Sequence, residues 1–395
     1  MTFIIFFLTL STLILIHELG HFTAAKMNGV KVHEFGLGLP PKIFGKKYGE
    51  TEYTLNWLPI GGFVRIEGED PAEKVADPKR SFQNKRVTVR MIILLAGVFM
   101  NFFLAVVLFY LFFLFNGFVS SPMVKFTNYS FVGANVKNVE TVISGIAGDN
   151  IKEKVYPGDT IFNASYDSIN LNDYVISEFS THEKQKNVSI LSSVKLKDFQ
   201  SFIDKSEGPV KIYLYNVQTQ ESRTITVTPS YDERLKRKII GVYLGSVFYL
   251  DYNKSFYTKT FSGFIHSYNI LVYSGQTFSN LISYSFATKN IAPVSEGVSG
   301  PVGIFSVIQG VLASKSPNII WILLDLVALL SLSLAFMNML PIPALDGGRA
   351  LFVFIEGVTR KKINPVIESE IHKYGMIFLL VLLAIITFKD VLNLF

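Results

Sequence analysis

The chain has 395 residues, of which 49% are hydrophobic and 35 are Phe, and its formal net charge is +6. This composition excludes a purely soluble single domain and indicates a membrane protein that carries a soluble part. Lys and Arg cluster beside apolar stretches, where they orient a chain in a bilayer, so we expect no nucleic-acid partner. The chain contains no Cys, and any metal ion must therefore be bound by His, Asp or Glu.

Four stretches are long and apolar enough to cross the lipid bilayer, at about 2–26, 88–115, 322–340 and 374–394. Basic residues crowd the connection after the first stretch and follow the third, so the positive-inside rule predicts that both connections are cytoplasmic. Both termini and the long segment between the second and third stretches are then extracytoplasmic. We expect a multi-pass protein of the bacterial inner membrane.

The first apolar stretch contains the motif HELGH at residues 17–21. His17 and His21 are four residues apart and share one helix face, so both imidazoles can bind one metal ion while Glu18 reaches a water on that ion. This H-E-x-x-H pattern is typical of zinc peptidases. A chance match or a cluster that only packs helices is the alternative, but ionisable groups inside a membrane are costly and usually functional.

A catalytic zinc site usually has three protein ligands, so a third must come from elsewhere in the chain. The sequence NMLPIPALDGG, residues 338–348, follows the third apolar stretch and places Asp346 at the membrane depth of the two histidines. Pro341 and Pro343 prevent a regular helix, and the Gly pair after Asp346 permits a tight turn. We expect irregular backbone there, which at this depth must be buried in protein or line a wet cavity, with Asp346 at the level of the histidines.

The first cytoplasmic connection has the pattern of a β-hairpin. Gly49 and Glu50 have turn chemistry, and Tyr53, Leu55 and Trp57 alternate with polar residues. Such a hairpin has an available edge and is a candidate for holding a substrate extended. A soluble surface hairpin without this role is the alternative.

The extracytoplasmic segment contains KVYPGDTIFNA at 154–164 and an alternating pair of strands in GPVKIYLYNVQTQESRTITVTPSYD at 208–232. These stretches resemble a PDZ domain, which here has a polar insertion around 167–206. In the following segment Phe261, Phe264 and Tyr268 recur at helical spacing, so we expect an amphipathic helix on the outer membrane surface or under the PDZ-like domain.

HELGH in the first stretch and NMLPIPALDGG in the third together resemble the site-2 protease family of intramembrane zinc metalloproteases, and within it the regulator-of-sigma-E protease (RseP) branch. LPIGGFVRIEGED, SFQNKRVTVRMIILLAGVFMNFFLA and SGPVGIF extend the resemblance over most of the chain in order. One departure is Val98, where the family usually has Pro, and we expect it to alter packing but not chemistry.

The resemblance implies Zn²⁺ as cofactor and Glu18 as the catalytic base, with the ligands His17, His21 and Asp346. It also implies a membrane-dipping hairpin that adds the substrate as a strand, and the expected substrate-binding residues are Asn338, Pro341, Pro343, Tyr53, Leu55 and Trp57. The implied substrates are single-span membrane proteins, such as anti-sigma factors already trimmed outside or signal-peptide remnants. An inactive metal-binding PDZ membrane scaffold, or a transporter, is the alternative, but both have less need of the intact Glu18.

The expected fold is a multi-pass α-helical membrane protein with four transmembrane helices, a cytoplasmic hairpin and an inserted β-rich PDZ-like domain. Its parts in chain order are transmembrane helix 1 (1–27), the cytoplasmic loop with the hairpin (28–87), transmembrane helix 2 (88–118), the PDZ-like domain (119–247), the amphipathic segment with the SGPVG loop (248–321), transmembrane helix 3 (322–348), a cytoplasmic connection (349–373) and transmembrane helix 4 (374–395).

Overall fold

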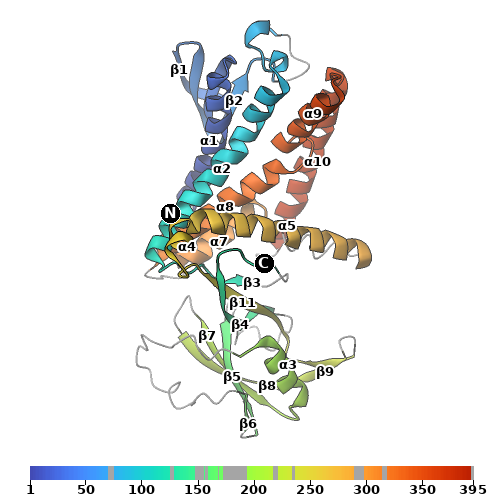
Figure 1. Cartoon of the computed structure of the whole chain (residues 1–395). Coiled ribbons are helices and arrows are strands. Elements are labelled where there is room, and N and C mark those ends of the chain that lie inside the picture. The colour runs from blue at the N-terminus through green and yellow to red at the C-terminus, as the bar shows by residue number, and fades with distance from the viewer. Residues whose placement is uncertain are drawn as a thin grey trace. The chain divides into compact units, whose positions relative to one another are not determined.

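The computed structural model of the chain (Figure 1) divides into two compact units, a helical unit of residues Met1–Phe112, Gly263–Ala313 and Ile320–Phe395, and a β-rich unit of Phe113–Ser262 and Ser314–Ile319. The residues that the structure describes are 1–69, 75–124, 129–146, 155, 159–167, 169–171, 194–216, 221–233, 236–288, 298–313 and 318–392.

Four helices among the described residues are long and apolar enough to cross a membrane, which confirms the four predicted membrane helices. They are α1 (Thr2–Met27), α2 (Val87–Phe115), α8 (Ile319–Met339) and α10 (Pro365–Leu392). At 1.5 Å per residue each spans roughly 30 Å or more, the thickness of the hydrocarbon core. α1 and α2 pack closely, because a Cβ on Gly20 would lie 2.4 Å from the carbonyl oxygen of Ala96.

The third and fourth predicted membrane segments have different boundaries in the structure. α8 ends at Met339, and a new helix, α9 (Asp346–Thr359), begins at the predicted ligand. α10 begins at Pro365, earlier than predicted, because the polar first turns of this helix continue directly into its apolar part. Asp346 therefore lies at the start of a separate helix and not at the end of a membrane span.

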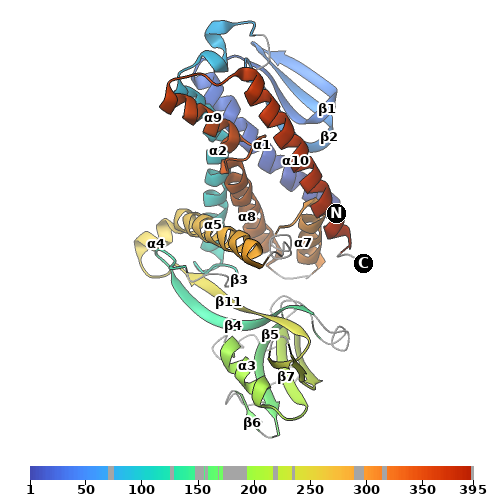
Figure 2. The ribbon, with the colours of Figure 1, turned by 90° about the vertical axis from the view of Figure 1, so that its right-hand side faces the viewer.

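The described residues between 248 and 313, where an amphipathic helix and a loop were expected, contain three helices. α4 (Phe256–Thr260) and α5 (Ser262–Thr288) cover the predicted amphipathic part, and α7 (Pro301–Ala313) is a short apolar helix that the sequence interpretation missed. Figure 2 shows α7 beside the N-terminal end of α1 and the C-terminal end of α10. The ring of Phe305 on α7 lies 4.7 Å from that of Phe3. Asp390 on α10 accepts hydrogen bonds from the N–H groups of Gly300 and Gly303, at 2.8 and 2.9 Å, and so satisfies free donors at the start of α7.

The predicted hairpin is present as β1 (Val32–Tyr48) and β2 (Thr51–Ile66), but it is folded back on itself. Residues Glu34–Leu37 of β1 have partners on both sides, Arg65–Gly62 on one side and Glu52–Leu55 on the other, while Lys42–Tyr48 pair with Asn56–Thr51. The same two strands thus supply four adjacent chain segments. Among the described residues no further strand pairs with the outer side of segment Gly62–Ile66.

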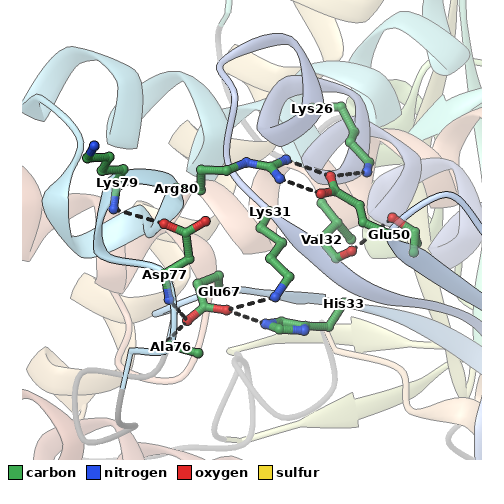
Figure 3. A network of polar contacts seen from close by, with 11 residues as sticks. Lys26, Lys31, Val32, His33, Glu50, Glu67, Ala76, Asp77, Lys79 and Arg80 are labelled. Atoms are coloured by element: carbon green, nitrogen blue, oxygen red, sulfur yellow. Dashed lines mark hydrogen bonds and ion pairs between the residues drawn. The ribbon is translucent and has the colours of Figure 1, made fainter.

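Two carboxylates stabilise the hairpin, one at its turn and one directly after the end of β2, and Figure 3 shows their polar contacts. Glu50, at the turn, accepts hydrogen bonds from Lys26 at the end of α1 and from both terminal nitrogens of Arg80, at 2.5–2.7 Å. Glu67 is buried and accepts from His33 at 2.5 Å and from the backbone N–H groups of Ala76 and Asp77. The turn of the hairpin is therefore fixed beside the end of α1. Two short 3-10 helices, Pro78–Arg80 and Phe82–Asn84, lead from the hairpin to α2.

The second unit is β-rich, as the alternating sequence predicts. Its seven-stranded sheet has the order β3-β11-β4-β5-β7-β8, with β6 paired to β5. The strands are β3 (Met123–Val124), β4 (Asn135–Ile146), β5 (Asp159–Tyr166), β6 (Ile169–Asn170), β7 (Val210–Asn216), β8 (Glu221–Val227) and β11 (Val242–Asp251); β9 (Ser230–Asp232) and β10 (Arg237–Ile239) form a separate pair. Helix α3 (Leu196–Lys205) contributes Phe199 and Ile203 to the core. Pro157, Gly158 and most of the predicted insertion lie outside the described residues.

Candidate metal centre

Helix α1 presents both histidines of HELGH from one face, and both are buried. Nε2 of His17 lies 3.2 Å from Nε2 of His21, as expected for side chains one helical turn apart. Oδ2 of Asp346 lies 2.9 Å from Nε2 of His17 and 3.3 Å from Nε2 of His21. The structure therefore brings together three side chains from residues 17, 21 and 346, although more than 300 residues of chain separate the motifs.

Asp346 reaches this position because the backbone between α8 and α9 is broken and compact. Ala344 has a left-handed φ of 79°. The two glycines that follow Asp346 are the first buried residues of α9, and neither has room for a side chain. A Cβ on Gly347 would lie 2.3 Å from the carbonyl oxygen of Leu340, and one on Gly348 would lie 2.3 Å from that of Ile342. These glycines are needed for close packing against the break and not for a tight turn.

Helix α10 supports the same break. Nδ1 of His372 accepts a hydrogen bond from the backbone N–H of Ala344 at 3.0 Å. A Cβ on Gly375, one turn further along α10, would lie 2.5 Å from the side chain of Pro343. The backbone two residues before Asp346 is thus held by a side chain and by a close contact from α10. An acceptor for a single backbone N–H leaves no pattern in the sequence, so sequence reasoning missed this role of His372.

Helix α2 lines the other side of the histidines. Nδ1 of His21 donates a hydrogen bond to the backbone carbonyl of Ile93 at 2.8 Å. Nδ1 of His17 lies 3.3 Å from Nδ2 of Asn101, which is completely buried. Between them, Gly97 leaves the space that the imidazoles occupy, because a Cβ there would lie 2.4 Å from Nε2 of His21. No sequence signal within α2 indicates that a backbone carbonyl and a glycine would contact the two histidines.

The three side chains fit a zinc ion. Nδ1 of His21 donates its proton to the carbonyl of Ile93, so in a neutral imidazole Nε2 carries a lone pair. This lone pair points toward His17 and Asp346. Converging lone pairs and a carboxylate need a shared cation. Tetrahedral bonds of about 2.0–2.1 Å separate neighbouring ligand atoms by about 3.3 Å, and the observed separations of 2.9–3.3 Å require only small outward shifts. Two imidazoles and one carboxylate are a donor set typical of catalytic zinc.

Glu18 lies beside this cluster on α1 and is only partly buried. It interacts electrostatically with His17, His21 and Asp346. A Cβ on Gly62 of β2 would lie 3.8 Å from Cγ of Glu18, so the hairpin approaches α1 at this residue. Glu18 therefore lies near both the ligand cluster and Gly62 of the hairpin.

The other predicted site residues are more scattered. Asn338 lies in the last turn of α8, and Pro341 and Pro343 lie in the break before Asp346. Tyr53 and Leu55 lie in a segment that is paired on both sides, so its backbone offers no free edge. The ring of Tyr53 packs 6.1 Å from that of Phe22 on α1, whereas Trp57 is 66% exposed. Gly62, in the segment Gly61–Ile66, lies close to Glu18, and alternation alone did not single out this segment.

Comparison with known proteins agrees with this geometry. Residues 5–382 match the model of peptidase family M50. A Fusobacterium nucleatum protein named as a zinc metalloprotease is 31% identical over 403 residues, covering 100% of both chains. A Clostridium perfringens protein with the same description is 31% identical over 391 residues, covering 98% of this chain and 97% of its own. The regulator of sigma-W protease RasP of Bacillus subtilis is 26% identical over 473 residues, covering 100% and 99%. The chain therefore belongs to peptidase family M50, the site-2 type of intramembrane zinc metalloprotease.

Proposed function

We propose that this metalloprotease binds Zn²⁺ through His17, His21 and Asp346 and uses Glu18 as the general base in peptide-bond hydrolysis. The observation that carries the proposal is the convergence of the three ligand atoms within 4.8 Å of one another, beside the carboxylate of Glu18. A scaffold without activity would need neither the converging donors nor an adjacent base.

Each protein group has a distinct part in the reaction. When bound, Zn²⁺ lowers the pKa of a coordinated water to about 7 and polarises the scissile carbonyl. Glu18 accepts the proton of the attacking water on its carboxylate and returns it to the nitrogen of the leaving amine. His17, His21 and Asp346 stay fixed by α2 and α10 while the proton moves, so little reorganisation is needed.

The substrate is a peptide bond in or near the membrane segment of a single-span protein, and its helix must be opened before a carbonyl is accessible. Segment Gly61–Ile66 of β2 supports extended binding, because its outer side is unpaired among the described strands and it passes Glu18. A substrate strand added there would receive main-chain hydrogen bonds beside the catalytic carboxylate. Asn338, Pro341 and Pro343 are proposed to contact the substrate from the break before Asp346, and Trp57 and Leu55 from the exposed face of the hairpin.

The proposed location is the bacterial inner membrane, with both termini and the β-rich unit extracytoplasmic and the metal centre near the cytoplasmic side. The basic residues around the hairpin support this orientation. The β-rich unit is proposed to be PDZ-like. The proposed substrates are anti-sigma-factor-like proteins or signal-peptide remnants, and the name of the Bacillus subtilis relative, regulator of sigma-W protease, favours the former.

The test is Glu18→Gln in the purified full-length protein with a model single-span substrate. Cleavage is expected to fall to background while bound zinc stays at the wild-type amount, because no ligand is changed. Asp346→Ala is the matched variant, in which zinc and cleavage are both lost. Retained cleavage by Glu18→Gln would contradict the mechanism, and retained zinc in Asp346→Ala would contradict the ligand set.

A further inference from the structure

We propose that Asn101 on α2 is a positioning residue that holds the imidazole of His17 in the form that binds metal. The inference rests on the proposed ligand set. It concerns a side chain that contacts no substrate and acts only through His17.

The observation is an unusual environment for a carboxamide. Asn101 is completely buried, with Nδ2 3.3 Å from Nδ1 of His17, and its Oδ1 has no hydrogen-bond partner in the described part of the chain. A buried polar atom without a partner costs about 1–3 kcal/mol. Its backbone carbonyl is fixed, because Ser331 on α8 donates a hydrogen bond to it at 2.8 Å. The backbone at Asn101 is therefore held by α8, while one of the two polar ends of its side chain is unsatisfied.

Metal binding requires a hydrogen-bond acceptor at this position. A neutral imidazole has one N–H, so a His17 that offers the lone pair of Nε2 to zinc must carry its proton on Nδ1. That proton needs an acceptor, and Nδ2 of Asn101 is a donor. The two ends of a carboxamide have nearly the same shape, so a half-turn of the Asn101 amide brings Oδ1 to Nδ1 of His17. The Nδ1–H group of His17 then donates to Oδ1, so the proton of His17 has its acceptor, while Nδ2 takes the position that Oδ1 had.

The same arrangement already exists at the second histidine. Nδ1 of His21 donates to the carbonyl of Ile93, which is eight residues before Asn101 on the same helix. Ile93, Gly97 and Asn101 are spaced by four residues and therefore share one face of α2. That face supplies an acceptor for each histidine and, at Gly97, the space for both rings. Partners of this kind orient metal-binding histidines, and their loss typically lowers metal affinity about 10–100-fold.

Two substitutions separate this role from simple packing. Asn101→Leu keeps the size but removes the acceptor, whereas Asn101→Asp keeps both the shape and an acceptor oxygen. Zinc affinity of the full-length protein is measured by competition with a chromophoric chelator. The dissociation constant is expected to rise about 10–100-fold in Asn101→Leu. Asn101→Asp is expected to keep wild-type affinity.

Thermal unfolding of the zinc-free protein provides the second readout. Zinc-free Asn101→Leu is expected to unfold near the wild-type temperature, because removal of the unsatisfied oxygen offsets loss of the contact with His17, and to gain less stability from added zinc. Wild-type zinc affinity in Asn101→Leu, equal weakening in both variants, or a lower unfolding temperature of zinc-free Asn101→Leu would overturn the inference. If Asp346→Ala loses zinc while Asn101→Leu does not, only this inference fails. If Asp346→Ala keeps zinc, the ligand set fails and the inference falls with it.

Discussion

Gly97 on α2 faces His21 on α1 so closely that a Cβ on Gly97 would lie 2.4 Å from Nε2 of His21. The same Cβ would lie 2.8 Å from Nε2 of His17, so it would occupy the space next to both proposed ligand atoms. Gly97→Ala is therefore expected to displace the imidazoles, lower zinc affinity at least about 10-fold and abolish cleavage. Metal content and cleavage of a model substrate are the measurements.

Gly310→Ala is the control for the Gly97 substitution. Gly310 also lies in an apolar helix, but nothing lies within 4 Å of a Cβ placed on it. Replacement of a helical Gly by Ala stabilises a helix by up to about 1 kcal/mol, so zinc content and cleavage should equal those of the wild type. Normal zinc binding by Gly97→Ala would show that the histidines do not need this space.

His372 is expected to support the metal centre from α10 through its contact with Ala344. His372→Ala leaves the Ala344 N–H without its acceptor, at a cost of about 1–3 kcal/mol, and should loosen the break that carries Asp346. Hydrogen exchange in residues 341–348 is expected to become faster and zinc content to fall. His372→Asn places an oxygen near the position of Nδ1 and should restore both. Unchanged exchange in His372→Ala would argue against this support.

The stability of the hairpin is expected to depend on pH through Glu50 at its turn. Hydrogen bonds from Arg80 and Lys26 lower the pKa of Glu50 from 4.5 to about 2. A lowered acid pKa stabilises the folded state above the unfolded pKa, so the contribution of Glu50 is complete above about pH 4.5 and is lost as the pH falls through about 2. Glu50→Gln should cost about 1–3 kcal/mol of hairpin stability at neutral pH.

The measurement for Glu50 is limited proteolysis of the hairpin in wild type and Glu50→Gln between pH 7 and pH 2, with an acid-tolerant protease at the low end. The difference between the two proteins should be constant down to about pH 5 and should disappear near pH 2. A difference that persists at pH 2 would show that the stability contributed by Glu50 does not come from its ion pairs with Arg80 and Lys26.

The outer edge of β2 is expected to receive the substrate. In an antiparallel strand, the N–H groups of successive residues point alternately toward and away from the neighbouring strand. Proline has no N–H group, so single proline substitutions at Phe63, Val64 and Arg65 remove N–H groups that point in each direction. At positions with outward N–H groups, the hairpin should stay folded while cleavage of a membrane substrate falls. At the other positions the hairpin itself should be destabilised.

The opposite edge of the hairpin supplies the control. Lys46 and Lys47 lie in the segment that pairs only with residues 51–56. On that edge, proline at a position whose N–H group points outward should leave both folding and cleavage unchanged. Cleavage that survives every folded substitution between residues 63 and 65 would exclude strand addition at this edge.

The sequence predicted features that depend on local periodicity. Hydropathy indicated the four long apolar helices, and the four-residue spacing of His17 and His21 placed them on one face. It did not predict the pairing in the hairpin, because alternation distinguishes the two faces of a strand but does not identify its neighbours. The roles of Gly97 and His372 were also missed, since a close approach between helices and an acceptor for one backbone N–H leave no pattern in a single sequence.

Zinc X-ray absorption spectroscopy on purified, full-length Glu18→Gln tests the central claim most directly. Two imidazole nitrogens at about 2.0–2.1 Å and one carboxylate oxygen at about 2.0–2.2 Å are expected, with the remaining position filled by water. The same spectrum of Asp346→Ala should show no stoichiometric zinc. One imidazole, more than two imidazoles, or an unchanged spectrum in Asp346→Ala would contradict a zinc centre formed by His17, His21 and Asp346.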